Sequence, residues 1–114
     1  MLLTKIFKFD SAHFLPNYHG KCEDMHGHTY RMEVTIEGEP DREDGMILDF
    51  KKLKEIVNEK VVDKLDHKLI NDVMPNPSAE FIAMWAWDQL KEHVNLKQIK
   101  VFETETSYVT YEGN

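Results

Sequence analysis

The segment His26–Glu37 alternates between two kinds of side chain, and it constrains the fold more strongly than any other feature of the sequence. One set of alternate positions carries imidazole, aromatic and apolar side chains: His26, His28, Tyr30, Met32, Val34 and Ile36. The other set is polar: Thr29, Arg31, Glu33, Thr35 and Glu37. Successive side chains of a β-strand point to opposite faces, so a period of two predicts a strand here. It is the clearest strand in the sequence.

Shorter patterns predict three further strands. Residues 3–10 have a strand-like composition, although their alternation is imperfect, and residues 14–25 form a loop rich in turn-forming residues. The polar residues 38–45 end the alternating strand. Near the end of the chain, residues 99–103 and 108–111 flank a short turn of Thr, Glu and Ser. These last two segments predict a hairpin.

Two helices are predicted between these strands. Asp49 is the expected N-cap of the first, which carries one apolar stripe and ends near Asp66-His67. Asn76 and Pro77 resemble the N-cap and first residue of the second, which runs to about Glu92. The order is ββααββ, with short connections that favour antiparallel pairing. We therefore predict an α+β fold with a four-stranded antiparallel sheet backed by two helices.

Composition excludes several classes of protein. A chain of 114 residues with 41% hydrophobic and 31% charged residues has the balance of one globular domain, covering residues 1–114. Its net charge of −7 and lack of a basic stripe argue against direct binding of nucleic acid. A single cysteine, an early charged residue in place of a signal peptide, and apolar runs too short to span a bilayer predict a cytoplasmic protein outside the membrane.

Three histidines are the strongest candidates for chemistry. His26 and His28 stand two residues apart in the alternating strand, so both imidazoles project from one face, about 6.5 to 7 Å apart at the backbone. His13 follows the first strand directly, and a neighbouring strand about 4.8 Å away brings it within reach of the same point. Three histidines with one open position are typical of a catalytic zinc site. We favour a metal site over three unrelated histidines.

Cys22 lies four residues before His26, on the loop that leads to this strand. Three interpretations of Cys22 are open: it is a fourth ligand that closes the metal site, a free thiol held nearby as a nucleophile or base, or a small buried residue. Spacing does not distinguish them. A thiol close to a divalent cation ionises more easily than a free one, which suits proton abstraction near neutral pH.

Two acidic positions are weaker candidates. In Asp66-His67 a carboxylate beside an imidazole can fix its tautomer, although such a pair at a helix end is more often a solvated cap. Glu103 shares its parity with Ile99 and Val101, so it is expected to point to their face of the strand. An acid there is either functional or lies past the buried part of the strand. A carboxylate can accept two parallel N–H bonds from an amidine-like edge, as guanine and pterin rings present.

Several motifs together resemble one family. Cys22-Glu23-Asp24-Met25-His26-Gly27-His28 resembles the Cys-x-x-x-His-Gly-His motif of the 6-pyruvoyl- and 6-carboxy-tetrahydropterin synthases. Further matching segments follow the family's order along nearly the whole chain: Phe9-Asp10-Ser11-Ala12-His13, Leu48-Asp49-Phe50, Leu65-Asp66-His67, Asn76-Pro77-Ser78-Ala79-Glu80 and Phe102-Glu103-Thr104-Glu105-Thr106-Ser107. Glu105 departs from the pattern, because many relatives in the carboxy branch have proline there.

The resemblance implies the tunnelling fold, in which four-stranded sheets join edge to edge into a barrel. It implies a homo-oligomer, a trimer or a hexamer made of two trimers, with active sites between subunits. Carried over to this sequence, it assigns zinc to His13, His26 and His28 and the role of proton-abstracting thiolate to Cys22. Asp66 and His67 become a second acid–base pair, and Glu103 anchors the pterin ring.

The implied substrate is 7,8-dihydroneopterin triphosphate. In the carboxy branch, loss of triphosphate and cleavage of the side chain give acetaldehyde and 6-carboxy-tetrahydropterin, a precursor of deazapurines such as queuosine. In the pyruvoyl branch the side chain is retained. The short chain resembles the carboxy branch more. Two other hypotheses stay open, namely an aldolase acting on dihydroneopterin and a zinc-stabilised structural oligomer in which Cys22 is the fourth ligand.

Overall fold

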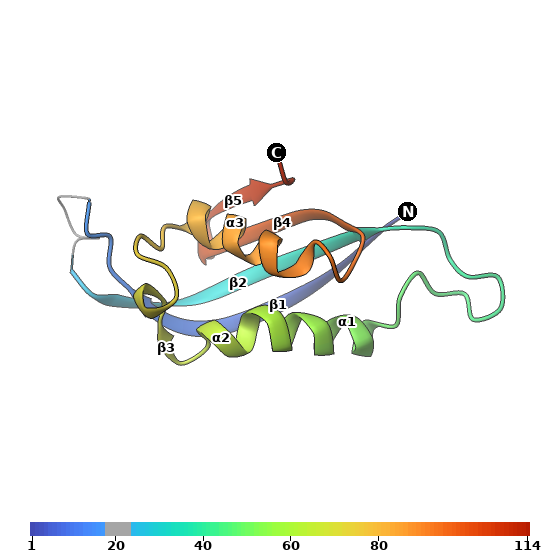
Figure 1. Cartoon of the computed structure of the whole chain (residues 1–114), viewed down its shortest axis with the longest axis horizontal. Helices are drawn as coiled ribbons and strands as arrows, with labels where there is room; N and C mark the ends of the chain where they lie inside the picture. The colour runs from blue at the N-terminus through green and yellow to red at the C-terminus, as the bar shows by residue number, and fades with distance from the viewer. Residues whose placement is uncertain (18–23) are drawn as a thin grey trace.

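A computed structural model describes residues 1–17 and 24–114, and within them five strands form one mixed sheet in the order β3-β1-β2-β4-β5 (Figure 1). The elements are β1 (Leu2–His13), β2 (His26–Glu37), α1 (Phe50–Val57), α2 (Asp63–Leu65), β3 (Lys68–Leu69), α3 (Ala79–Leu90), β4 (Leu96–Thr104) and β5 (Ser107–Tyr111). The predicted α+β class and the four antiparallel strands β1, β2, β4 and β5 are confirmed.

The sheet differs from the prediction in two respects. The two residues of β3 add a fifth strand, parallel to β1 at Ser11 and Ala12, so the sheet is mixed. The first strand also continues to His13 instead of ending at residue 10, because Ser11, Ala12 and His13 remain paired with β2. Both differences arise from pairing with distant segments, which the local pattern of a strand does not contain.

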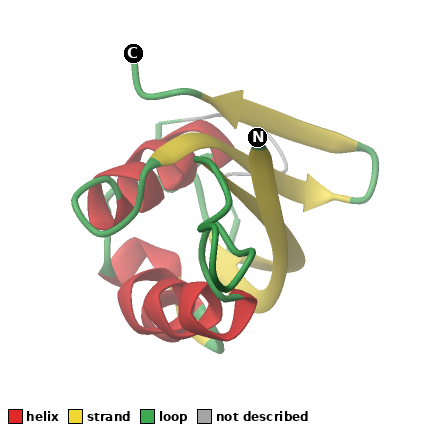
Figure 2. Ribbon diagram, turned by 90° about the vertical axis from the view of Figure 1, so that its right-hand side faces the viewer, coloured by secondary structure: helices red, strands yellow, loops and turns green. Residues whose placement is uncertain are grey.

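Side-chain alternation gives the sheet one buried face and one open face. In β1, Phe7, Phe9, Ser11 and His13 are buried, whereas the residues between them are exposed or half-buried. The helices cover the buried face, and within residues 1–17 and 24–114 the opposite face of the sheet carries no helix (Figure 2). The core between the two layers includes Tyr30, Met32 and Val34 from β2 and Ile99 and Val101 from β4.

The first helix begins as predicted but contains an irregular turn. The Asp49 side chain accepts a hydrogen bond from the Lys51 backbone N–H (2.9 Å), which confirms the N-cap. A π-helical segment, Asn58–Val62, separates α1 from α2. The buried residues Leu53, Val57, Val61 and Leu65 recur every four positions. In a regular helix, three such steps would rotate the apolar stripe by about 120°, and the wider turn reduces this drift.

The second predicted helix begins two residues later than expected and ends at Leu90. Its N-cap is Ser78, whose hydroxyl accepts from the Phe81 N–H (3.2 Å), and not Asn76. The Pro77 carbonyl instead contacts the imidazole Nδ1 of His13 (2.7 Å). Two neighbouring residues before α3 therefore have different roles: Ser78 caps the helix, and the Pro77 carbonyl orients the His13 ring. No helix in the described ranges is long and apolar enough to cross a membrane.

Candidate metal centre and active site

The three predicted histidines meet at the end of the sheet, on its helix-covered face. His13 at the end of β1 pairs with His26 at the start of β2, and His28 follows two residues later on the same face. One ring nitrogen from each histidine lies within 4.8 Å of the other two. We call His13, His26 and His28 the triad.

Backbone contacts orient two of these rings. The Nδ1–H of His13 donates to the Pro77 carbonyl, and the Nδ1–H of His26 donates to the Asp24 carbonyl, each at 2.7 Å. In a neutral imidazole this leaves a lone pair on Nε2. The Nε2 atoms of His13 and His26 then face each other at 3.0 Å. Two facing lone pairs repel unless a cation or a proton lies between them, and outer contacts of this kind are typical of metal-ligating histidines.

The third ring has a free donor atom. His28 Nε2 is buried and has no hydrogen-bond partner within residues 1–17 and 24–114. Burial lowers the pKa of His28, although the nearby Glu103 carboxylate acts in the opposite direction. A lowered pKa keeps the ring neutral at neutral pH, which is the form that binds metals. The donor set therefore fits a divalent cation, and three imidazoles suit zinc among others.

Glu103 also lies at the triad. Its position on β4 shares the buried face with Ile99 and Val101, as its parity predicts. Its Oε1 lies 3.5 Å from Nε2 of His28, and its Oε2 lies 3.9 Å from Nε2 of His13. The side chain is 28% exposed, so the carboxylate borders both the three rings and solvent.

Asp66 and His67 form a second cluster at the edge of β1. Asp66 Oδ1 lies 3.0 Å from Nδ1 of His67 and accepts a hydrogen bond from the Asp10 N–H, also at 3.0 Å. The His67 N–H donates to the Asp10 carbonyl (2.6 Å), and Thr29 donates its hydroxyl to Asp10 Oδ1 (2.5 Å). The hydrogen bond from the Asp10 N–H is the main reason why the pKa of Asp66 is lowered. This carboxylate is therefore ionised and can hold one imidazole tautomer.

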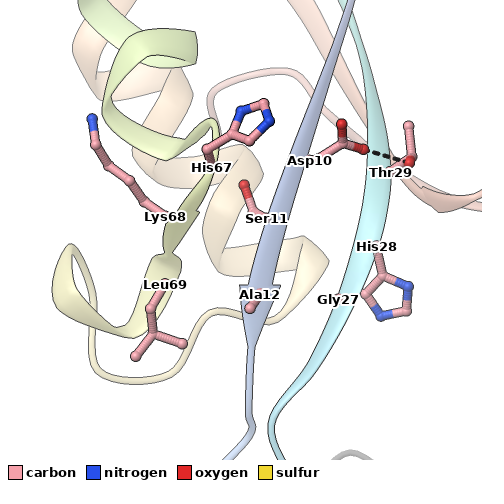
Figure 3. Close-up of a pocket in the computed structure, with 9 residues that line it drawn as sticks. All are labelled: Asp10, Ser11, Ala12, Gly27, His28, Thr29, His67, Lys68 and Leu69. Carbon is pink, nitrogen blue, oxygen red and sulfur yellow. Dashed lines mark hydrogen bonds between the residues drawn. The ribbon is translucent and has the colours of Figure 1, made fainter.

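The two clusters use different faces of the same strands. Asp10 and Thr29 are exposed neighbours across β1 and β2, whereas His13 and His28 occupy the opposite parity on the covered face. Figure 3 shows His67 and His28 on opposite sides of the β1–β2 pair. A cavity of about 520 Å³ runs along these strands and includes both residues in its wall. One chain thus holds the triad and the Asp66–His67 pair apart from each other.

Some expected residues cannot be placed, and others were missed. Cys22 lies outside the described residues. The sequence does not indicate Asp10 and Thr29 as site residues, because an exposed Asp and Thr in strands carry no local signal and only the pairing of β1 with β2 joins them. The contact of the Pro77 carbonyl with His13 is likewise not predictable from a sequence motif, because it joins two distant segments of the chain. The described residues define an α+β protein in which three histidines are placed so that they could hold a cation, together with a carboxylate–imidazole pair, a combination found in metal-dependent enzymes.

Comparisons with known proteins identify the family. Residues 2–114 match the sequence profile described as 6-pyruvoyl tetrahydropterin synthase. The 6-pyruvoyl tetrahydrobiopterin synthase of Dictyostelium discoideum is 35% identical over 130 aligned residues, covering 99% of this chain and 96% of its own. The 6-carboxy-5,6,7,8-tetrahydropterin synthase of Haemophilus influenzae is 32% identical over 137 aligned residues, covering 96% and 97%. The chain belongs to the 6-pyruvoyl tetrahydropterin synthase family.

A solved structure supports the same conclusion. The 6-pyruvoyl tetrahydropterin synthase of Caenorhabditis elegans has a TM-score of 0.90 and 26% sequence identity, covering 100% of this chain and 96% of that chain. The predicted tunnelling fold is thereby confirmed for the single chain. The relatives carry different activity names, and a dihydroneopterin monophosphate aldolase of Pyrococcus furiosus is also 38% identical over 99 aligned residues, covering 83% of this chain and 82% of its own. The comparisons therefore identify the family and leave the particular activity among its members undetermined.

Proposed function

We propose that the chain is a zinc-dependent 6-carboxy-5,6,7,8-tetrahydropterin synthase, in which residues 1–114 act as one cytoplasmic catalytic domain. Its substrate would be 7,8-dihydroneopterin triphosphate, and its products 6-carboxy-tetrahydropterin, acetaldehyde and triphosphate, on the route to deazapurines such as queuosine. The geometry of the triad is the main support for this proposal. Two Nε2 atoms face each other, and the third Nε2 is buried and has no hydrogen-bond partner in the described residues, so the three nitrogens are arranged as the ligands of a cation would be. The synthase and aldolase names among the relatives all concern pterins.

The triad would hold zinc, which supplies a Lewis acid for the side-chain hydroxyls of the substrate. The contacts from the Pro77 and Asp24 carbonyls keep two of the rings in the ligating tautomer. Because the His28 side chain as a whole is 18% exposed, a substrate oxygen would approach the triad from the His28 side. The chain thus provides a preorganised binding site for the reacting end of the substrate.

Asp66 and His67 would transfer protons. Asp66 holds Nδ1 of His67, so the ring's Nε2 is the atom that exchanges a proton with the substrate. The lowered pKa of Asp66 keeps it anionic, and an anion there stabilises the imidazolium that forms when His67 accepts a proton. Cys22 is proposed as the second base on the family resemblance alone.

Glu103 would anchor the pterin ring. Its carboxylate borders the triad, so a ring held by its two oxygens would place the attached side chain at the metal. A carboxylate can accept two parallel N–H bonds from the amidine-like edge of a pterin. This role selects the ring system, while the triad and His67 act on the side chain.

A second copy of the chain completes the site in this proposal. One edge of β1 pairs with β2, and its other edge pairs in the described chain with β3 at Ser11 and Ala12 alone. At the far side of the sheet, β5 has β4 as its one described neighbour. Open edges of this kind pair with other strands. Joining β1 of one subunit to β5 of the next would close a barrel, as a trimer or as a hexamer of two trimers. It would also bring the Asp66–His67 pair of one subunit to the triad of another.

Product analysis tests the activity. We would supply the zinc-loaded protein with enzymatically generated 7,8-dihydroneopterin triphosphate, measure acetaldehyde and identify the pterin by mass. Acetaldehyde with 6-carboxy-tetrahydropterin is the expected result. Triphosphate release with a retained three-carbon side chain would instead identify a 6-pyruvoyl tetrahydropterin synthase, the activity named for the Dictyostelium relative.

A protein without turnover would favour a structural metal. In that alternative, Cys22 closes the zinc site as fourth ligand, chelation of zinc dissociates or unfolds the oligomer, and the bound metal protects the thiol from alkylation. The proposed enzyme stays folded without metal and keeps a reactive thiol. Circular dichroism and alkylation of Cys22, each with and without a chelator, separate the two.

A further inference from the structure

The contact between Glu103 and the triad is not a hydrogen bond. Oε1 of Glu103 lies 3.5 Å from Nε2 of His28, yet that nitrogen has no hydrogen-bond partner in the described part of the chain. Oε2 lies 3.9 Å from Nε2 of His13, which already faces His26 at 3.0 Å. Each carboxylate oxygen therefore stands opposite a different ring nitrogen without bonding to it.

These separations resemble those between donors that share one ion. In a tetrahedral zinc site the ligand atoms lie about 2.0 to 2.1 Å from the metal, so neighbouring donors lie about 3.3 Å apart. The pairs His13–His26, His28–Glu103 and His13–Glu103 measure 3.0, 3.5 and 3.9 Å. The distances scatter around the expected edge of such a tetrahedron.

The charges favour the same arrangement. Three neutral imidazoles leave a divalent cation with its full charge at a site where His13 is completely buried. A carboxylate placed beside the ring nitrogens removes part of that charge, which lowers the cost of holding the ion away from water. Glu103 is the acidic side chain that the described structure places within 4.0 Å of the triad nitrogens.

We propose that Glu103 is a displaceable fourth ligand that completes the metal's coordination while no substrate is bound. The inference rests on the metal site of the proposed function and adds a second role to the ring-anchoring residue. When a pterin ring offers its N–H edge, the carboxylate turns to accept those bonds and leaves the fourth position to a substrate oxygen. Ring recognition and access to the metal are then coupled through one side chain.

Metal affinity tests the ligand role without any assay of activity. We would titrate Zn²⁺ into the metal-free protein against a chromogenic chelator, for the unchanged protein and for Glu103→Gln, Glu103→Asp and Glu105→Gln. Both changes at position 103 are expected to weaken zinc binding by about 10-fold or more, as loss of a metal-site partner does. Glu105→Gln is the matched control, because it removes the same charge two residues away from an exposed side chain.

Glu103→Asp separates ligation from simple charge attraction. It keeps the negative charge but withdraws the carboxylate by one methylene. If Glu103→Asp binds zinc like the unchanged protein while Glu103→Gln binds it more weakly, only charge attraction is present and the inference is overturned. Equal zinc affinities for all four proteins overturn it as well.

Azide binding gives a second readout. In the Co²⁺-loaded protein, the visible absorption of the metal reports an anion entering its coordination shell. A fourth position held by Glu103 resists azide, so both variants at position 103 are expected to bind azide at least about 10-fold more tightly, while Glu105→Gln is unchanged. Unaltered azide affinity would contradict the inference. A protein that binds neither Zn²⁺ nor Co²⁺ would overturn the metal site itself, which distinguishes that failure from the loss of the ligand role alone.

Discussion

The triad and the Asp66–His67 pair differ in how completely one chain builds them. His13 is fully buried, and two of the three rings are fixed by backbone carbonyls. His67, in contrast, is 78% exposed, and it is joined to the sheet through the main chain of Asp10. The triad is therefore the preorganised half of the proposed site, while the Asp66–His67 pair is its open half, left for whatever covers the edge of β1.

Backbone strain marks the open half. His67 has φ +57°, a left-handed conformation that residues other than glycine rarely adopt. The hydrogen bond from its N–H to the Asp10 carbonyl helps to hold this conformation. Strained residues of this kind cluster at functional sites, where the surrounding structure maintains them. The turn that ends α2 therefore presents the imidazole of His67 beside Asp66 instead of continuing a helix.

The largest effect is expected from breaking the preorganised half. His13→Ala removes a buried donor, so zinc affinity should fall at least about 100-fold and activity should be lost with it. Competition with a chelator measures the affinity. His93→Ala is the control, because His93 is exposed and lies outside the triad. Unchanged zinc affinity in His13→Ala would show that the metal does not bind at the triad.

A change in the open half should separate catalysis from metal binding. His67→Ala removes the proposed proton carrier, and kcat should fall about 10²- to 10⁴-fold. Zinc affinity should stay as it is, because the ring stands apart from the triad. Steady-state kinetics and zinc titration of the same preparation check both. A parallel loss of zinc would mean that the two clusters form one site within the chain.

Mixing two inactive variants tests whether the clusters meet across subunits. His13→Ala and His67→Ala, unfolded and refolded together, should recover a fraction of the unchanged protein's activity, since some sites then combine an intact triad with an intact pair. Each variant refolded alone should stay inactive. Absence of recovery in mixed oligomers, with assembly confirmed by mass, argues that each chain supplies its own complete site.

A smaller effect concerns the dependence of stability on pH. The pKa of Asp66 is lower in the folded chain than in the unfolded chain, so its contribution to stability is present above the unfolded value and is lost as the pH falls through the folded one. Asp66→Asn should therefore lower the urea midpoint at neutral pH, and the difference should vanish in strong acid. Urea titrations over a pH series measure it. If the urea midpoints of the two proteins differ by the same amount at every pH, the charge of Asp66 is not the cause of the difference.

The smallest effect is expected at Gly27, which separates His26 from His28. A methyl group there would lie 3.6 Å from the Ser11 carbonyl, an ordinary contact, and the backbone conformation does not require glycine. Gly27→Ala should therefore leave zinc affinity unchanged and stabilise the strand by at most about 1 kcal/mol. Chemical denaturation checks the stability. A weakened triad would show that the rings depend on the freedom of this residue.

The sequence itself determined which residues share a face. Alternation in His26–Glu37 placed two histidines on one side of a strand, and the parity of Glu103 directed it to the same side; both placements agree with the structure. The N-cap at Asp49 and the final hairpin also follow from neighbouring residues, and the structure contains both. Faces and caps depend on residues a few positions apart, so periodicity and side-chain chemistry are enough to predict them.

Which of these residues meet depends on how distant segments of the chain pack together. Ser78 caps α3, and the neighbouring carbonyl of Pro77 orients His13, 64 positions away in the chain. Asp10 joins Asp66 and His67 because β1, β2 and the end of α2 converge, and nothing in the pattern around residue 10 indicates this. Register, strand neighbours and hydrogen bonds between distant segments depend on the whole packed chain, so a local pattern does not contain them.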